Sequence, residues 1–278
     1  MADNVFTNLI FVSDGGGSTP SEVAGTICNS MIGFRNSLLT ATVSGADADA
    51  SYPFSNCLDY KDNTQYSPSA TSGTVTIEFT QSSDIEIDYI GIAIHNGSTA
   101  SLVGRLDVFV NGTWETVASF TPLGDLRTIC EKFDTVTCSK QRLVLTFESK
   151  LYIGTVYIGK SWEFARLPNV GFVPGNTNNI DRVVNFKSNQ SGQFIIGRRQ
   201  QVGYAQSGEF DFLSFDGDIA NYTDYMHHVK DSKPFFMKWN VNVAQSMFGQ
   251  HANPNNLRPP TYTTNNNWTF SFDMEGYN

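Results

Sequence analysis

The stretch that decides the fold runs from Ile85 to Trp114 and reads IEIDYIGIAIHNGSTASLVGRLDVFVNGTW. Residues Tyr89 to Ile94 are apolar at nearly every position except Gly91, and apolar residues then alternate from Leu106 to Val110 before an Asn-Gly pair. β-branched and aromatic residues at a spacing of two favour strands, and Asn-Gly supplies the positive φ angles of a tight turn. Because Tyr89 to Ile94 has almost no polar face, we predict that this strand lies between two layers.

The composition is typical of a folded β protein with a neutral, hydrogen-bonding surface. Hydrophobic residues make up 40% and aromatic residues 13% of the 278, which is ample for a packed core, whereas only 16% are charged. The length suits two domains. The net charge of -9 argues against a nucleic-acid partner, because phosphate binding requires a patch of Lys and Arg. We interpret the pair Arg198-Arg199 as a solvated strand end.

The sequence predicts no membrane insertion. The N-terminus has no positive region and too short an apolar run for a signal peptide, and no segment approaches the ~18 apolar residues of a membrane span. We therefore expect synthesis in a host cytoplasm. The four cysteines show no metal-binding spacing, which argues against zinc; they are Cys28, Cys57, Cys130 and Cys138.

Four segments are expected along the chain. Residues 1–34 are expected to form an N-terminal arm, because an apolar start precedes a Gly-rich run; the alternative is a strand of the first domain. Residues 35–165 carry eight or so short strands with turn signals between them, which predicts an all-β jelly-roll sandwich. Residues 166–180 predict a linker. Residues 181–278 predict a smaller β-sandwich-like domain with one α-helix near 217–231, where apolar residues recur at helical spacing.

Turn signals divide these domains further. Within the first domain, separate strands are expected at Thr74 to Phe79 and Tyr89 to Ile94, and again at Thr128 to Phe133 and Arg142 to Phe147. In the second domain, Asn240 to Thr264 is expected to be a long polar loop.

Residues 35–165 contain, in order, LDYKDNTQYSP, VTIEF, DYIGIAIHNGS, RLDVFVNGTWETVASF and QRLVLTFESKLYIGTVYIGK. This order resembles the galactose-binding-like family, which includes discoidin and coagulation-factor C domains. The sequence departs from the family at three positions: Tyr60 stands where the family favours Gly, Lys61 where it often has Asp, and Tyr66 where it usually has Trp. The resemblance implies a jelly-roll sandwich of the galactose-binding-like type.

The second half of the chain contains GQFIIGRR, then KPFFMKWN, then NNNWTFSFDMEGY. Over residues 168–278 this arrangement is similar to structural proteins of tailed-phage virions, and most of all to the tail-tip and baseplate group. The similarity implies symmetric assembly with copies of itself and with other virion proteins.

The resemblance to galactose-binding-like domains also implies a structural Ca²⁺ at the Leu-Asp turn. The oxygen ligands on offer are Asp59, Asp62 and Thr64, and hard oxygen donors on a tight loop suit calcium. Lys61 replaces an expected acid, and GTVYIG lacks the Glu that commonly completes the family's site. The alternative is that Asp59 caps its own turn. If calcium binds, EDTA should lower the melting temperature of residues 35–165.

Sugar sites on such sandwiches combine an aromatic platform with polar side chains on end loops. The candidate carbohydrate-binding residues, in or near predicted loops, are Tyr52, Tyr60, His95, Arg105 and Trp114. The alternatives are that Tyr52 anchors its loop and that Trp114 belongs to the core.

Catalysis is not expected. The sequence has no GxSxG, HExxH or P-loop motif. His227 and His228 are adjacent on the predicted helix and point about 100° apart, so they cannot chelate one metal together. We predict that the protein is not an enzyme.

Both resemblances together predict a virion structural protein of a tailed bacteriophage, located in the tail as a tail-tip, baseplate or fibre-attachment component. Its second domain and arm would hold it in a symmetric assembly, and its sandwich would contact host-surface glycans. The alternative is a free-standing carbohydrate-binding protein. A third interpretation is a head decoration protein with the same fold.

Overall fold

The computed structural model describes residues 29–61, 63–125, 127–164, 167–169, 172, 179–187, 194–254, 259, 261–262 and 267–277. Most of the expected arm and most of the expected linker lie outside these residues. The described elements are strands together with one α-helix, α1 (Phe215–Lys230), and two short 3-10 helices, η1 (Ser37–Thr40) and η2 (Phe54–Cys57). The predicted all-β fold class with one helix is confirmed.

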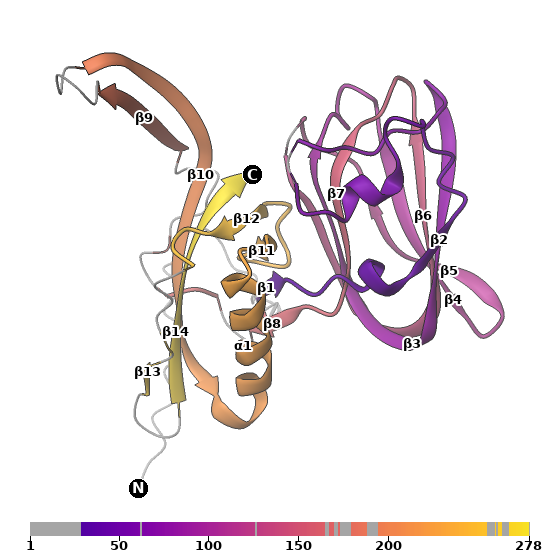
Figure 1. The fold of residues 1–278 in the computed structure, drawn as a ribbon. Coiled ribbons are helices and arrows are strands. Elements are labelled where there is room, and N and C mark those ends of the chain that lie inside the picture. The colour runs from indigo at the N-terminus through magenta and orange to yellow at the C-terminus, as the bar shows by residue number, and fades with distance from the viewer. Residues whose placement is uncertain are drawn as a thin grey trace, which may run out of the picture.

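The first unit is a sandwich built from six strands of the described residues: β2 (Thr42–Ser44), β3 (Gly73–His95), β4 (Val103–Val110), β5 (Thr113–Phe120), β6 (Ile129–Phe147) and β7 (Ile153–Gly159). The strand order is β2-β3-β6-β4-β5, and β7 also pairs with β3. The first part of β3 pairs with the last part of β6, and the register shifts between Thr80 and Ile85. Both strands therefore bend and contribute to two layers (Figure 1).

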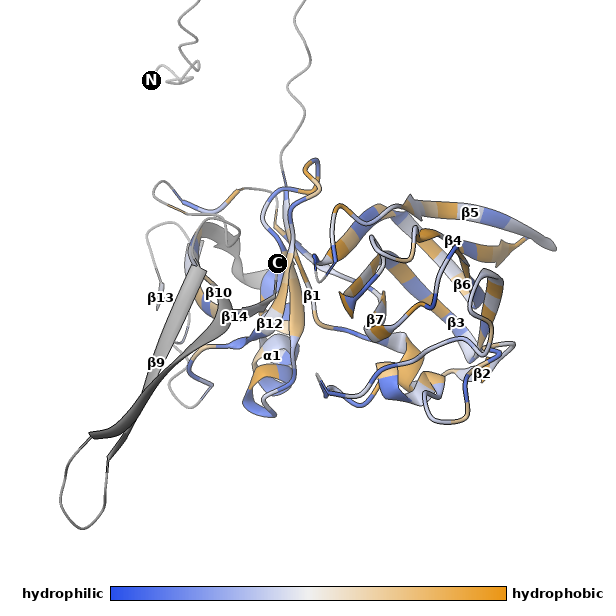
Figure 2. Cartoon of the chain, turned by 90° about the horizontal axis from the view of Figure 1, so that it is seen from above, coloured by the Kyte–Doolittle hydropathy of each residue, from blue (hydrophilic) through white to orange (hydrophobic). Residues whose placement is uncertain are grey.

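Local alternation decides which side chains enter the sandwich core. Leu106 and Val108 of β4 are buried in it, and Figure 2 shows hydrophobic and hydrophilic residues alternating along β4 and β5. On β3, Ile90 and Ile92 enter this core, whereas Tyr89 and Ala93 enter a separate cluster shared with the second unit. The predicted burial of this strand between two layers is confirmed.

The second unit is a sheet of eight strands within the described residues: β1 (Ser30–Gly33), β8 (Trp162–Phe164), β9 (Asn179–Lys187), β10 (Phe194–Ser214), β11 (Phe235–Lys238), β12 (Met247–His251), β13 (Thr261–Tyr262) and β14 (Asn267–Tyr277). We call it the second sheet. Its order is β8-β1-β11-β12-β14-β10-β9, with β13 paired to β14.

The second sheet includes strands from both sides of the sandwich sequence. β1 pairs with β8, which follows the sandwich, and with β11 near the end of the chain. The sandwich is therefore inserted between β1 and β8, which lie side by side (Figure 1). The sequence predicted an arm for residues 30–33, whereas the structure places them inside the second sheet. The sequence could not show this because the strands that pair with them lie far along the chain.

Helix α1 begins at Phe215 and ends at Lys230, in agreement with the helix expected near 217–231. Its Tyr225 and Val229 pack in one cluster with Phe235 and Met247 of the second sheet. β12 corrects the expectation of a continuous polar loop from Asn240 to Thr264. Only two of its five residues are large and apolar, too few to produce an alternating signal.

The sequence neighbours of Phe235 and Met247 point toward the sandwich instead. Phe236 and Phe248 pack with Met31, Tyr89 and Tyr157. Hydrogen bonds accompany this apolar contact: the Tyr157 hydroxyl donates to the Pro234 carbonyl at 2.9 Å, and the buried Lys238 Nζ donates to the Cys130 carbonyl at 2.6 Å. The two units therefore share a core as well as two chain connections.

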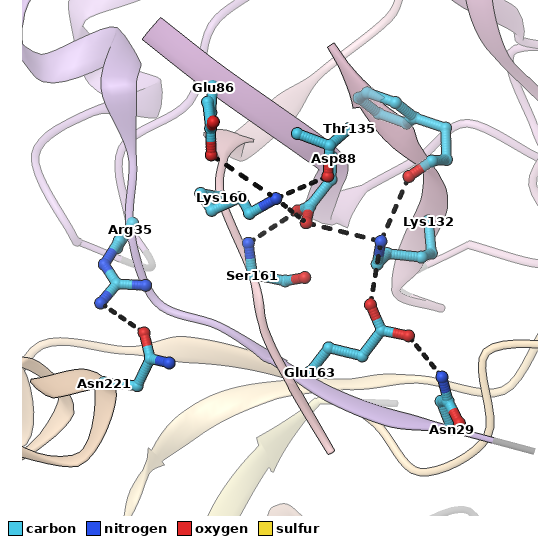
Figure 3. A network of polar contacts seen from close by, with 11 residues as sticks. Asn29, Arg35, Glu86, Asp88, Lys132, Thr135, Lys160, Ser161, Glu163 and Asn221 are labelled. Atoms are coloured by element: carbon cyan, nitrogen blue, oxygen red, sulfur yellow. Dashed lines mark hydrogen bonds and ion pairs between the residues drawn. The ribbon is translucent and has the colours of Figure 1, made fainter. Parts of the chain in front are cut away.

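A network of charges continues this junction (Figure 3). Asp88 is 2% exposed and accepts a hydrogen bond from the Ser161 backbone N–H at 2.7 Å. Its carboxylate lies 3.4 Å from Lys132 Nζ and 3.3 Å from Lys160 Nζ, and Lys132 also pairs with Glu163 of β8 at 3.3 Å. Because Asp88 and Lys132 belong to the sandwich and Glu163 to the second sheet, this network ties the two units together.

Candidate functional site

A cavity of about 590 Å³ lies where the sandwich meets the second sheet. That volume is in the range of small-ligand sites. The sandwich supplies part of its lining and the segment from Pro234 to Gly276 supplies the rest: Tyr60, Lys61, Asn63, Ile94, Thr155, Pro234, Phe248, Gly249, Gln250, His251, Ala252, Pro254, Glu275 and Gly276. We call this cavity the cleft.

Tyr60 occupies the cleft at some conformational cost. Its φ angle is 60°, in the left-handed region, where a residue with a Cβ pays about 1–2 kcal/mol relative to the right-handed region. Glycine would not pay this cost. The half-buried ring lies edge-on to Tyr157, with centroids 6.1 Å apart, and to His228 at 6.4 Å. These contacts hold the Tyr60 ring in place on the cleft wall.

Two paired glycines keep part of the cleft wall free of side chains. Gly249 of β12 faces Gly276 of β14 in register. A Cβ built on either glycine would lie 2.1 Å from a backbone oxygen of the other strand, that of Glu275 or Phe248. No other residue fits such a close approach, so bare backbone lines the cleft here. On the next paired position Gln250 and Glu275 are both exposed and line the cleft.

Burial keeps the ring groups in the cleft neutral. It raises the pKa of Tyr60, which therefore remains a phenol at neutral pH. It lowers the pKa of His251, although Asp273 nearby and a hydrogen bond oppose this. His251 Nδ1 accepts a hydrogen bond from the Asn253 backbone N–H at 3.1 Å, so the proton of the neutral ring sits on Nε2. Nε2 is then the donor atom of the His251 ring.

The formal charges of the cleft lining balance. Lys61 contributes one positive charge and Glu275 one negative charge, and the other polar groups are neutral donors and acceptors. An aromatic ring among planar amide, imidazole and carboxylate groups suits a neutral ligand with many hydroxyl groups and a partly apolar ring face.

The five residues predicted to bind carbohydrate fall in different places. Tyr60 lines the cleft. Tyr52 lies on the loop before β3, is 38% exposed, and contacts the Tyr152 ring with centroids 5.6 Å apart. His95 is only 1% exposed, and its Nδ1 accepts a hydrogen bond from the Gly97 backbone N–H at 3.1 Å. The turn after β3 folds over this ring, so His95 is not on the surface as expected.

Arg105 and Trp114 lie on the outer face of the sandwich. Arg105 is half-exposed, and its Nε donates to Asp107 at 3.2 Å. Trp114 is half-buried: its ring lies 5.2 Å from the Phe109 ring, and the Arg142 guanidinium lies 4.5 Å from its centroid. These contacts cover part of the Trp114 ring, in keeping with the alternative of a packing role.

The contacts of Asp59 favour the turn-capping alternative over calcium. Both carboxylate oxygens accept from Thr64 Oγ1 at 2.9 Å, and Oδ1 also accepts from the Lys61 backbone N–H at 3.0 Å. The Lys61 ammonium lies 3.8 Å away and would repel a cation. Asp62 lies outside the described residues. Among those that are described, no group of three or more His, Cys, Asp or Glu could hold a metal ion.

Sequence reasoning missed the cleft residues of the second sheet. Gln250 and His251 were assigned to a polar loop, and Glu275 follows the final strand pattern without any distinguishing motif. Sequence signals existed for Tyr60, a bulky residue where glycine was expected, and for Lys61, a base where an acid was expected.

No protein-family model matches the sequence, and no curated protein matches it. Within the described residues, no helix is both long and apolar enough to cross a bilayer.

Three solved structures illustrate what the chain is similar to. The structure of SpGH29 is 18% identical over 46% of this chain, with a TM-score of 0.40, and a Ruminococcus gnavus GH29 fucosidase in complex with fucose is 14% identical over 46%, with a TM-score of 0.38. The chain spans 28% and 27% of their lengths. The family 32 carbohydrate-binding module of C. perfringens NanJ, in complex with galactose, is 15% identical over 47% of this chain and 98% of its own length, with a TM-score of 0.38.

Proposed function

We propose that this protein binds carbohydrate and that the cleft is its binding site. The observation that carries the proposal is the Tyr60 ring, held at a φ of 60° on the wall of a cavity of about 590 Å³ whose charges balance. An aromatic ring provides a stacking surface for the apolar face of a sugar, and amide, carboxylate and imidazole groups bind its hydroxyls.

Each polar group has a defined part in this proposal. His251 Nε2 donates to a sugar hydroxyl, Glu275 accepts from one, and Gln250 does both. The bare backbone of Gly249 and Gly276 leaves room for the sugar ring between them and Tyr60.

Calorimetric titration with neutral oligosaccharides tests the proposal. Tyr60→Gly removes the ring and also relieves the left-handed strain, so the variant should fold and lose roughly tenfold in affinity, about 1.4 kcal/mol. Gln250→Ala should lower affinity without changing stability, because the side chain is exposed. Tyr52→Ala is the matched control, since it removes an exposed tyrosine from the same loop. Loss of binding in Tyr52→Ala with full binding in Tyr60→Gly would refute the assignment to the cleft.

We also propose that the protein is a component of a tailed-phage virion, located in the tail, where it assembles with copies of itself and other virion proteins. The junction supports this: a shared core and the Asp88 network fix the direction in which the sandwich extends from the second sheet. A ring component needs such a fixed direction, because many weak sugar contacts then act together.

Gold-labelled antibody against residues 35–165, applied to phage particles of the source culture, tests the virion proposal. Label at one tail end supports it, label over the head indicates a decoration protein, and bare particles beside abundant soluble protein leave a free carbohydrate-binding protein.

A further inference from the structure

The outer face of the sandwich carries a groove that is separate from the cleft. Along β4, Leu106 and Val108 enter the core, so Val103, Arg105 and Asp107 face outward. The strand registers place Ser119 and Val144 beside Arg105, and Thr146 beside Val103. These neighbours bound a cavity of about 360 Å³ that is lined by Val103, Gly104, Arg105, Ser119, Phe120, Thr121, Val144 and Thr146.

A buried carboxylate organises the positive charge at one end of the groove. Asp107 is 2% exposed and accepts hydrogen bonds from Arg142 Nε at 2.8 Å, Arg105 Nε at 3.2 Å and Thr116 Oγ1 at 2.7 Å. Burial alone would raise the pKa of Asp107, but these hydrogen bonds outweigh it and lower the pKa. Asp107 is therefore charged at neutral pH. Two guanidinium groups face this carboxylate: Glu78 of β3 lies opposite Arg142 in the strand register, whereas Arg105 lies opposite Ser119 and Val144.

The geometry directs the Arg105 charge outward. Asp107 engages both arginines through Nε, so their terminal nitrogens remain for another acceptor. Stacking over Trp114 at 4.5 Å holds Arg142 in place, whereas the Arg105 side chain is 49% exposed and lines the groove. A guanidinium anchored at Nε is pre-organised to bind a carboxylate, and less side-chain entropy is lost on binding.

We propose that this groove binds an acidic polysaccharide, with a carboxylate of the glycan accepting hydrogen bonds from Arg105. Ser119, Thr121 and Thr146 offer hydroxyls to the sugar, and the exposed Val103 offers an apolar surface to its ring. The chain as a whole carries a net charge of -9, so its long-range field repels an anionic glycan. Binding must therefore come from short-range contacts in the groove.

The proposal does not depend on the cleft. The groove and the cleft share no lining residue, and the groove takes a charged ligand whereas the cleft takes a neutral one. The Tyr60→Gly variant should therefore retain full affinity for an acidic glycan, and Arg105→Ala should retain full affinity for a neutral one.

The test is calorimetric titration of the full chain with oligogalacturonate and oligomannuronate, and with the methyl ester of the former, in which the carboxylates are uncharged. Lys140→Ala is the matched control for Arg105→Ala: it removes one positive charge from the same sheet layer, and Lys140 Nζ lies 5.7 Å from the Phe109 ring, outside the groove lining. We expect at least tenfold weaker binding of the acid by Arg105→Ala, less than twofold weaker by Lys140→Ala, and at least tenfold weaker binding of the ester by the wild type.

Four outcomes would overturn the proposal. The first is that the wild type binds neither acidic oligosaccharide. Equal losses in Arg105→Ala and Lys140→Ala would indicate diffuse charge attraction, and an ester that binds as tightly as the acid would exclude recognition of the carboxylate. Equally tight binding of poly-glutamate would indicate a surface for acidic peptides. Arg105→Lys distinguishes guanidinium recognition from charge alone, because lysine keeps the charge but loses the planar donor pair and should recover only part of the affinity.

Discussion

Gly91 tests whether the sandwich and the second sheet are as tightly packed as the structure indicates. A Cβ added at this position of β3 would lie 2.7 Å from three ring atoms of Phe236, whereas ordinary contacts begin at 3.4 Å. The ring would have to retreat by about 0.7 Å. It cannot do so freely, because its centroid lies 5.2 Å from that of Tyr157 and 4.6 Å from that of Phe248.

Overpacking of this kind costs typically 1–3 kcal/mol, so Gly91→Ala should lower the free energy of unfolding by about 2 kcal/mol. For a chain of this size the melting temperature should fall by roughly 4–8 °C. Urea unfolding followed by circular dichroism and tryptophan fluorescence measures the first quantity, and calorimetry measures the second.

A double-mutant cycle separates the clash from other effects of the substitution. Phe236→Leu loses buried area on its own, but it makes room for the new methyl group. Combined with Gly91→Ala it should cost at least about 1 kcal/mol less than the sum of the single variants. Additive costs within about 0.5 kcal/mol, or a Gly91→Ala variant as stable as the wild type, would refute the reasoning.

Three further predictions concern single groups. Burial lowers the pKa of His228 below the usual 6.5, so the unfolded chain takes up a proton at a higher pH than the folded chain does. Stability should therefore be complete above pH 6.5 and decline as the pH falls toward 5, less steeply in His228→Asn. A melting temperature that rises as the pH falls from 6.5 to 5 would contradict the prediction. Asp59→Ala should cost about 1 kcal/mol through its lost turn hydrogen bonds, while EDTA should leave the wild-type melting temperature unchanged; a fall with EDTA would instead establish a calcium site. Asp88→Asn should lower the free energy of unfolding by about 2 kcal/mol, which is less than the ~3–5 kcal/mol of a fully buried ion pair because the two lysine partners are partly exposed. The control Asp84→Asn, on the exposed bend nearby, should cause no measurable change.

Local patterns were sufficient for the elements whose signal is local. The alternation of β4 and the helical spacing of α1 each predicted the element that forms. The same signals divided β3 wrongly into two strands, because Ser82-Ser83-Asp84 reads as a turn. In the structure this segment is a bend with a register shift, and β6 accompanies it. Sequence shows a break in the apolar pattern but not whether the paired strand bends with it.

The site was predictable only at Tyr60 and Lys61, which depart from an expected pattern. Tyr60 attracted attention as an aromatic residue at a turn. Its partners across the cleft, Gln250 and Glu275, come from strands about 200 residues later in the chain. His95 was misplaced because a histidine before Asn-Gly reads as part of an exposed turn, whereas the chain after it folds back over the ring.

The insertion of the sandwich between β1 and β8 has a consequence for synthesis on the ribosome. Met31 of β1 pairs with Lys238, and the difference of 238 and 31 is 207 residues. At about 5–20 residues per second, β1 waits roughly 10–40 s for β11 to emerge, whereas its other partner, β8, follows directly on the sandwich. The sandwich should therefore fold first, while the apolar strand β1 remains unpaired on its β11 side and is a target for chaperones until β11 has been made.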